Sequence, residues 1–228
     1  MAGNVSPGLL QEFVEIPAGW HLLGGILRVP PAAQGVVAFA HGSGSGRLSP
    51  RNQAVARALE THGFGTLLVD LLDPREAEDR EKVFDITLLA DRVTRVLRWL
   101  ANRPETATLR RGLFGASTGA AAALQAAAQT PELVDAVVSR GGRPDLAYDY
   151  LGQVRAPTLL IVGGHDDLVL QWNQTALALL NCPKELTIVP GAGHLFEEPG
   201  KLDEVARLAG RWFDRYLKGE GGSHVSQP

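Results

Sequence analysis

Ser117 lies between two glycines, Gly115 and Gly119, directly after a strand-like stretch (109–114) and directly before an alanine-rich run (120–128). This order predicts a strand, a sharp turn and a helix, with Ser117 on the turn. A nucleophile held there must adopt strained backbone angles, and a side chain two positions away would collide with the strand or the helix. The two glycines meet that requirement. A chain with 26 glycines can also produce the spacing by chance, so the flanking elements carry most of the inference.

Two carboxylates and a histidine follow Ser117, on turns that leave two later predicted strands. Asp166 and Asp167 are adjacent, and His194 ends a Gly-Ala-Gly-His turn. A serine hydroxyl is a poor nucleophile at neutral pH, so it needs an imidazole to accept its proton and a carboxylate to orient that imidazole. Ser117, Asp166 and His194 could therefore perform nucleophilic catalysis, with Asp167 as the alternative acid.

A glycine-rich loop at residues 41–47 follows the buried strand predicted at residues 35–40. One hypothesis is a dinucleotide site, with Asp70 binding a ribose hydroxyl. The fingerprint fails in detail, because its third glycine should stand where Arg47 is and Gly46 comes one place early. The second hypothesis is that amides of this loop form half of an oxyanion hole. A flexible loop is the third, but it does not explain the position after a buried strand.

Four arginines are expected on loops or helix starts at or near the same edge of the sheet: Arg47, Arg51, Arg140 and Arg143. Their ordinary role is to pair with rim carboxylates and to cap carbonyls. The more specific hypothesis is that they recognise an acidic substrate. We take Arg47 and Arg143, together with His41 and Gly42, as possible substrate-binding residues. His41 is expected to hold the glycine-rich loop by hydrogen bonds.

The remaining elements are predicted from apolar runs, helical periodicity and turn residues. The strands are expected at residues 12–17, 20–30, 35–40, 64–72, 109–114, 133–138, 157–162 and 185–189, and the helices at residues 50–63, 85–104, 120–128, 172–180 and 202–217. Ser49 and Asp85 are predicted to cap the first two of the helices. The polar stretch at residues 73–82 is predicted to be a solvated loop or a short exposed helix, with a mobile flap as a less favoured alternative.

This alternation of strands and helices after a leading hairpin predicts the α/β class, with a mostly parallel eight-stranded sheet covered on both faces. Ligands of such sheets bind at the carboxyl ends of the strands, and the turns that carry Ser43, Ser117, Asp166 and His194 all leave strands at that edge. Only residues 144–155 stand where many hydrolases insert a lid domain. We therefore expect an open site without a sizeable lid.

Composition limits the classes of function. The net charge of -3 favours neither nucleic acid nor an anionic membrane as a partner, and the single cysteine, Cys182, excludes an internal disulfide. No segment resembles a signal peptide or a membrane span, so we expect a cytoplasmic protein. One domain is predicted over residues 1–228, as a monomer or a homodimer, with an ordered core at residues 12–217 and a disordered tail at residues 219–228.

No cofactor is expected, and no metal, because no cluster in the sequence has metal-ligand spacing. Three histidines have no apparent use: His21 on a strand, His62 at a helix end and His224 in the tail.

Four motifs together make the chain, from about residue 15 to residue 217, resemble the serine α/β-hydrolases. Within them it is similar to the small, lid-less members grouped with dienelactone hydrolase. The matching residues are His41-Gly42, Gly115-x-Ser117-x-Gly119, Gly164-His165-Asp166-Asp167-Leu168-Val169 and Gly191-Ala192-Gly193-His194. The resemblance implies Ser117 as nucleophile, Asp166 as acid and His194 as base, with the amides of Ser43 and Thr118 binding the oxyanion. It favours Asp166 over Asp167, because a Gly-x-Asp-x-x-Val pattern marks the acid turn, and it makes His165 a loop residue.

One position departs from the family pattern. Dienelactone hydrolases use a cysteine nucleophile, whereas this chain has Ser117. The expected substrate is therefore a small carboxylic ester rather than a dienelactone. Thioesterase, short-peptide peptidase and perhydrolase activities use the same machinery and stay open. A protein that binds a small molecule without catalysis is the alternative from another class.

Overall fold

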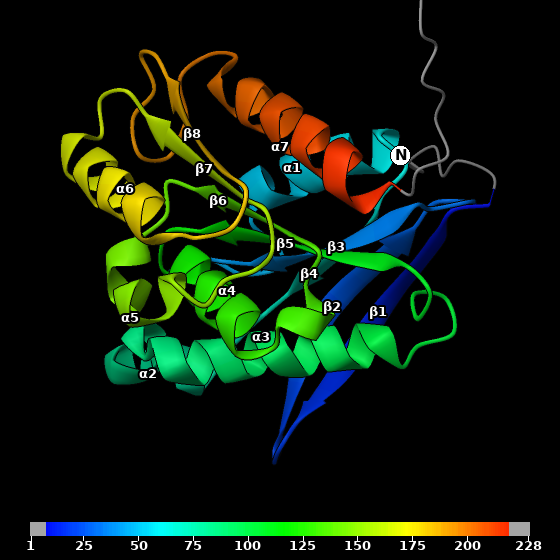
Figure 1. The fold of residues 1–228 in the computed structure, drawn as a ribbon. Coiled ribbons are helices and arrows are strands. Elements are labelled where there is room, and N and C mark those ends of the chain that lie inside the picture. The colour runs from blue at the N-terminus through cyan, green and yellow to red at the C-terminus, as the bar shows by residue number, and fades with distance from the viewer. Residues whose placement is uncertain (1–7, 219–228) are drawn as a thin grey trace, which may run out of the picture.

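The computed structural model describes residues 8–218, and in them an eight-stranded sheet lies between two layers of helices (Figure 1). The strand order is β1-β2-β4-β3-β5-β6-β7-β8. β1 pairs antiparallel with β2 and β2 antiparallel with β4, while every other neighbouring pair is parallel. The predicted leading hairpin and mostly parallel sheet are both confirmed. The strands are β1 Leu10–Ala18, β2 His21–Val29, β3 Gly35–Ala40, β4 Gly65–Val69, β5 Arg110–Ala116, β6 Ala136–Arg140, β7 Thr158–Gly163 and β8 Lys184–Val189.

Two strand predictions need correction at their ends. The strand predicted at residues 64–72 ends at Val69, and the buried Leu71 and Leu72 continue as irregular chain. The strand predicted at residues 133–138 begins only at Ala136, because Pro131–Leu133 forms a 3₁₀ turn, and it continues to Arg140. Apolar runs therefore locate these strands but do not define where pairing stops.

The longer helices are α1 Pro50–Thr61, α3 Ile86–Ala101, α4 Thr118–Gln129, α6 Asp167–Leu179 and α7 Lys201–Leu217, and the short ones are α2 Arg80–Phe84 and α5 Tyr148–Leu151. The predicted caps are present: the Ser49 side chain accepts a hydrogen bond from the amide of Asn52, and Asp85 accepts one from the amide of Leu88. The helix predicted at residues 172–180 begins five residues earlier, at Asp167.

Helices cover both faces of the sheet, as predicted. α1 and α7 pack together on one face, while α3, α4 and α6 cover the other (Figure 1). Along β3 and β5 alternate residues enter the two cores, so that Phe39 and Phe114 face α1 and α7 with ring centroids 5.0 Å apart. Residues 144–155 pack against α4 and α6 as a 3₁₀ turn and α5, and no lid domain is present in the described residues.

The segment at residues 73–82 is mostly exposed, and of the two predicted forms it takes that of a short exposed helix rather than a loop, apart from one buried side chain. It contains the 3₁₀ turn Glu76–Glu78 and the start of α2, and the Glu76 side chain is buried, with Arg92 Nη2 3.0 Å from its Oε1. Arg92 also donates to the Ala18 carbonyl at 2.6 Å. His21 Nδ1 lies 2.6 Å from Asp73 Oδ2. These contacts fasten the segment to the β1–β2 hairpin.

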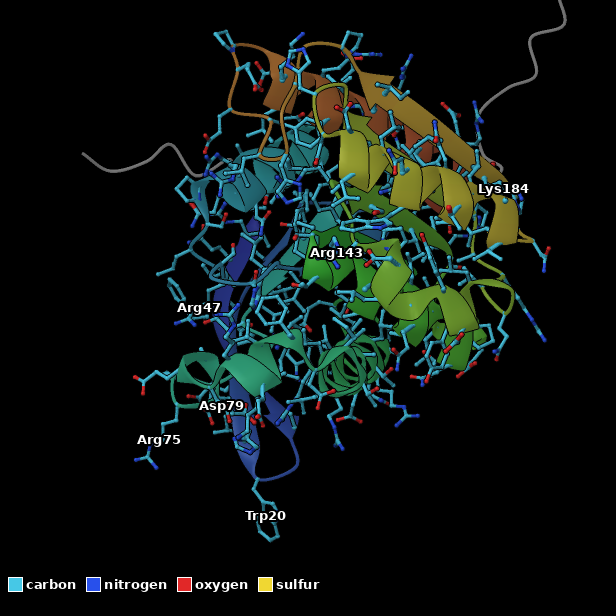
Figure 2. All side chains as sticks on the ribbon, turned by 90° about the vertical axis from the view of Figure 1, so that its left-hand side faces the viewer. Trp20, Arg47, Arg75, Asp79, Arg143 and Lys184 are labelled. Atoms are coloured by element: carbon cyan, nitrogen blue, oxygen red, sulfur yellow. The ribbon has the colours of Figure 1, made fainter. Side chains whose placement is uncertain are left out.

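His21 and His62, for which the sequence indicates no use, both have carboxylate partners: His21 pairs with Asp73, and His62 Nδ1 lies 2.9 Å from Asp214 Oδ2 on α7. Both partners are far away in the sequence. His224 and the tail predicted to be disordered lie outside the described residues. Trp20, at the tip of the hairpin, points away from the rest of the molecule and is fully exposed (Figure 2). No helix in the described part of the chain is long and apolar enough to cross a membrane.

Candidate active site

Ser117 stands on the turn between β5 and α4 in a conformation that few non-glycine residues adopt. Its φ is 51° and its ψ is -123°. A Cβ on Gly119 would lie 2.1 Å from the Ala40 carbonyl oxygen, and one on Gly115 would lie 2.5 Å from Ala120 Cα. No side chain fits at either position. The two glycines therefore let the turn form tightly against β3 and the start of α4.

The acid and the histidine meet at the same edge of the sheet. Asp166 Oδ2 lies 2.6 Å from His194 Nδ1. Asp166 occupies the cap position of α6, but its side chain makes no capping hydrogen bond and turns to the histidine instead. Asp167, the first residue of α6, is exposed, and so is His165. The structure thus brings Asp166, and not Asp167, to His194.

His194 and Ser117 line one cavity of about 220 Å³. With Nδ1 occupied by Asp166, the Nε2 atom of His194 is the ring nitrogen available to a substrate or to the serine. Within residues 8–218 no hydrogen bond joins the Ser117 hydroxyl to His194. Catalytic hydrogen bonds are often long in unliganded enzymes and tighten in the substrate complex.

Two residues that the sequence does not single out hold the site together. Glu198 Oε1 accepts a hydrogen bond from the Gly193 amide at 2.9 Å, beside His194, and its pKa is lowered by its own backbone amide and that of Gly193. The buried Asn173 donates to the carbonyl oxygens of Gly142, at 3.0 Å, and Val169, at 2.8 Å. The only signal for Asn173 in the sequence is a polar amide side chain inside a predicted helix, and its burial is known only from the structure.

The loop after β3 approaches Ser117 closely. A Cβ on Gly42 would lie 2.9 Å from Ser117 Cβ. The Ser43 amide, one of the two expected oxyanion donors, donates to Thr118 Oγ1 at 3.1 Å. The Thr118 amide lies in the first turn of α4, where backbone N–H groups have no partner within the helix. A substrate oxyanion would have to share or replace the Thr118 hydroxyl at the Ser43 amide.

His41 fixes this loop to the end of β4. Its Nδ1 lies 2.9 Å from the Gly42 carbonyl oxygen and donates to it, while its Nε2 accepts from the Leu71 amide at 3.0 Å. This pairing requires the neutral ring. Burial lowers the pKa of His41, which keeps the ring neutral. Both ring nitrogens are therefore used by the backbone, and His41 has none left for a substrate.

The four arginines fall into two groups: Arg47 and Arg143 pair with carboxylates, whereas Arg51 and Arg140 line the cavity of Ser117 and His194. Arg47 forms an ion pair with Asp70, and its amide donates to the same carboxylate at 2.6 Å. Asp70 is thus already paired, which removes the residue that the dinucleotide hypothesis required. Arg143 binds Asp145 with two hydrogen bonds of 2.9 and 2.8 Å, and its guanidinium lies 4.1 Å from the centre of the Trp172 ring. Both of the arginines proposed for substrate binding already have carboxylate partners.

Arg140 and Arg51 line the cavity that contains Ser117 and His194. Arg140 is only 7% exposed, and its Nε has no hydrogen-bond partner. Burial, and secondarily the positive charge of Arg51, lowers the pKa of Arg140 to about 10. Arg140 is still a cation at neutral pH.

A second cavity of about 300 Å³ lies along the same loop and shares Gly42, Ser43 and Ser45 with the first. Its apolar lining residues include Leu22, Leu72, Val83 and Leu89. Asp73, Pro74 and Ala77 also border it, so the segment at residues 73–82 forms part of a cavity wall.

One group in the described residues brings three potential metal ligands within 4.8 Å of one another: His21, Asp73 and Glu76. The Glu76 carboxylate is already paired with Arg92, and Lys82 Nζ lies 3.9 Å from it. The group is fully accounted for as an ion-pair network, and we assign no metal to it.

A mostly parallel sheet with helices on both faces, and a serine on a strained turn between its central strand and a helix, define the α/β-hydrolase fold. The comparisons with known proteins agree with this class. The family profile described as "Dienelactone hydrolase family" matches residues 24–218, and the chain belongs to this family.

Solved structures give the same picture. A dienelactone hydrolase from Anabaena variabilis is 52% identical, with a TM-score of 0.89 over 92% of this chain and 99% of that one. Est1E from Butyrivibrio proteoclasticus has a TM-score of 0.77 at 14% identity, over 89% of this chain and 98% of that one, and this likeness concerns the fold alone.

A Mycobacterium tuberculosis (strain H37Rv) protein named "Putative phosphoribosyl transferase" is 57% identical over 217 residues. The match covers 95% of this chain and 49% of that protein. The chain thus spans about half the length of this curated relative.

Proposed function

We propose that this protein is a serine hydrolase that cleaves small carboxylic esters through an acyl-enzyme at Ser117. The observation that carries the proposal is the Asp166–His194 contact of 2.6 Å beside a strained serine in one cavity. Perturbed backbone geometry of this kind persists where the surrounding structure and a function require it. Membership of the dienelactone hydrolase family supports hydrolysis as the reaction class.

In this mechanism the Ser117 oxygen attacks the ester carbonyl carbon while His194 Nε2 accepts the hydroxyl proton. Asp166 keeps the other ring nitrogen protonated and stabilises the imidazolium. The amides of Thr118 and Ser43 bind the oxyanion of the tetrahedral intermediate. The alcohol then leaves with the proton from His194. Water attacks the acyl-serine with His194 again as base, which releases the carboxylic acid and restores Ser117.

The transferase name gives this chain no second candidate function. It belongs to a protein about twice as long, and the part aligned with this chain corresponds to the hydrolase fold described above. The same serine machinery could act on a thioester, a short peptide or a peroxyacid precursor, and the substrate screen below separates these.

The direct test is labelling by a fluorophosphonate probe, followed by mass spectrometry of the labelled peptide. We expect modification of Ser117 in the wild type and none in Ser117→Ala. A screen of esters and thioesters with varied acyl and leaving groups then defines the reaction. A wild-type protein that neither reacts with the probe nor hydrolyses any ester would favour the non-catalytic binding protein.

A further inference from the structure

Arg140 is a buried cation in the wall of the cavity that holds Ser117 and His194. It is the last residue of β6, next to Ala116 of β5 in the sheet register, so its backbone adjoins the turn that carries the nucleophile. Its carbonyl oxygen accepts the Ser117 amide at 3.3 Å. The position of Arg140 relative to the nucleophile is therefore set by the sheet and not by a mobile loop.

No carboxylate within residues 8–218 forms an ion pair with Arg140, and its Nε is buried without a hydrogen-bond partner. The charged side chain that influences it is Arg51, a second cation. Taking an unpaired charge out of water is costly, and most buried arginines have a carboxylate partner or complete hydrogen bonding. Arg92, which is also buried, follows that rule because it pairs with Glu76.

Arg51 lines the same cavity and differs from Arg140 in exposure. Its Nη1 lies 2.9 Å from Glu197 Oε1, but the Glu197 side chain is 63% exposed. Exposed pairs of this kind contribute little stability, so Arg51 can exchange its partner at small cost. The cavity thus presents one buried and one adaptable guanidinium beside the nucleophile.

We propose that Arg140 and Arg51 form an anion-binding subsite, and that the ester hydrolysed at Ser117 carries an oxyanion group, a carboxylate or a phosphate, near its scissile bond. This inference rests on the proposed esterase function for its substrate, while the anion site itself does not depend on turnover. Two guanidiniums suit the planar, multidentate recognition of such a group. The bound anion supplies the counter-charge that Arg140 lacks, and it fixes the carbonyl relative to Ser117.

The kinetic test compares esters that differ only in charge. In the first pair, monoethyl adipate and diethyl adipate, the charged ester carries its carboxylate on the acyl side. In the second pair, 4-acetoxybenzoate and its methyl ester, the charged ester carries it on the alcohol side. We expect the wild type to prefer one anionic ester in kcat/KM. Arg140→Met should lower the ratio of anionic to neutral kcat/KM for that pair by about 10- to 100-fold, the range for a hydrogen bond to a charged group.

Arg140→Lys should retain part of the preference, because it keeps the charge and loses the planar fork. The matched control is Arg207→Gln on α7, whose side chain pairs with Glu204 and does not line the cavity. The control should leave the ratio unchanged. An unchanged ratio in Arg140→Met would overturn the proposal.

A second measurement is independent of turnover. Melting temperatures of the Ser117→Ala protein are compared in sodium phosphate, sodium succinate and sodium chloride at equal ionic strength. We expect phosphate or succinate to raise the melting temperature, and the rise to vanish when Arg140→Met is added. A rise in phosphate would indicate a substrate that carries a phosphate, and a rise in succinate one that carries a carboxylate.

Arg140→Met should also melt no lower than the wild type in chloride, since it removes an unpaired buried charge. A lower melting temperature together with no response to either anion would show that Arg140 is structural, and would overturn the proposal. If no ester is hydrolysed but the anion shift appears and depends on Arg140, the esterase function fails and the anion site stands. If neutral esters are hydrolysed, but neither the kcat/KM ratio nor the melting temperature responds to an anion, the proposal of an anion site is wrong and the esterase function stands.

Discussion

Asp166 Oδ2 lies 2.6 Å from His194 Nδ1, although Asp167 is its neighbour in the sequence and also carries a carboxylate. The difference arises from the start of α6. Asp166 precedes the helix with φ of -107° and ψ of 64°, which directs its side chain toward the histidine turn, whereas Asp167 is already helical and exposed. One carboxylate can orient the imidazole and the other cannot reach it.

We therefore predict that Asp166→Asn lowers kcat for an activated ester by about 10⁴-fold with the fold retained, because the amide favours the wrong tautomer of His194. Asp167→Asn should leave kcat near the wild-type value and cost about 0.3 to 1 kcal/mol of stability, the value of an acidic residue in the first turn of a helix. Turnover and melting temperature of both variants check this. A large rate loss in Asp167→Asn, with a normal rate in Asp166→Asn, would show that Asp167 and not Asp166 orients His194.

Ser117→Ala should abolish ester hydrolysis while keeping the fold, leaving only the effects of binding and the oxyanion donors. The backbone of Ser117 supplies a second expectation. At φ 51° glycine is unstrained and alanine is not, so Ser117→Gly should be more stable than Ser117→Ala by about 1 kcal/mol. Denaturant unfolding of both variants measures this difference. Equal stabilities would show that the turn stores no strain, and wild-type turnover in either variant would contradict the role of Ser117.

Gly119→Ala should destabilise the protein by about 2 kcal/mol or more, because the new methyl group would lie 2.1 Å from the Ala40 carbonyl oxygen in a tightly packed core. Gly152→Ala is the matched control, since the nearest atom, Asn181 Nδ2, is 3.6 Å away. Urea unfolding of both variants compares them. A Gly119→Ala protein as stable as the control would mean that β3 and α4 can separate freely at this point.

The lowered pKa of His41 predicts a loss of stability in acid. The usual pKa of histidine is about 6.5, so below that pH the unfolded state binds a proton at His41. The folded state does not bind this proton until the pH reaches the lower pKa of the buried ring. The free energy of unfolding should therefore fall as the pH drops from 6.5 through that interval. His41→Asn should show a shallower fall and a slower ester hydrolysis, because the Gly42–Leu71 link is lost. An identical pH slope in the wild type and the variant would exclude His41 as the origin.

Short acyl esters should be hydrolysed faster than long ones. The two cavities along the loop after β3 measure about 220 and 300 Å³, and no lid domain is present in the described residues. Acetate and butyrate esters should exceed dodecanoate esters in kcat/KM by about tenfold or more. No rate increase is expected at the surface of an ester emulsion. Faster hydrolysis of long-chain emulsions would contradict an open, shallow site.

The sequence alone determined the order of the elements, the Ser117 turn and the caps at Ser49 and Asp85. Each of these depends on local physics: apolar periodicity within one element, the space that a glycine leaves, or a side chain that bonds an amide three residues away. The family motifs then located the acid and histidine turns, since parallel strands end at one edge of the sheet.

Only the tertiary structure decided which charged groups have partners. Arg47 meets Asp70, and Arg92 meets Glu76, across distances in the chain that no local pattern encodes. Arg140 resembles the other arginines in sequence, yet it alone of the four near the site is buried with an unpaired Nε. Burial and ion pairing depend on how several elements pack around one atom, and that packing exists only after the sheet and its helices have come together.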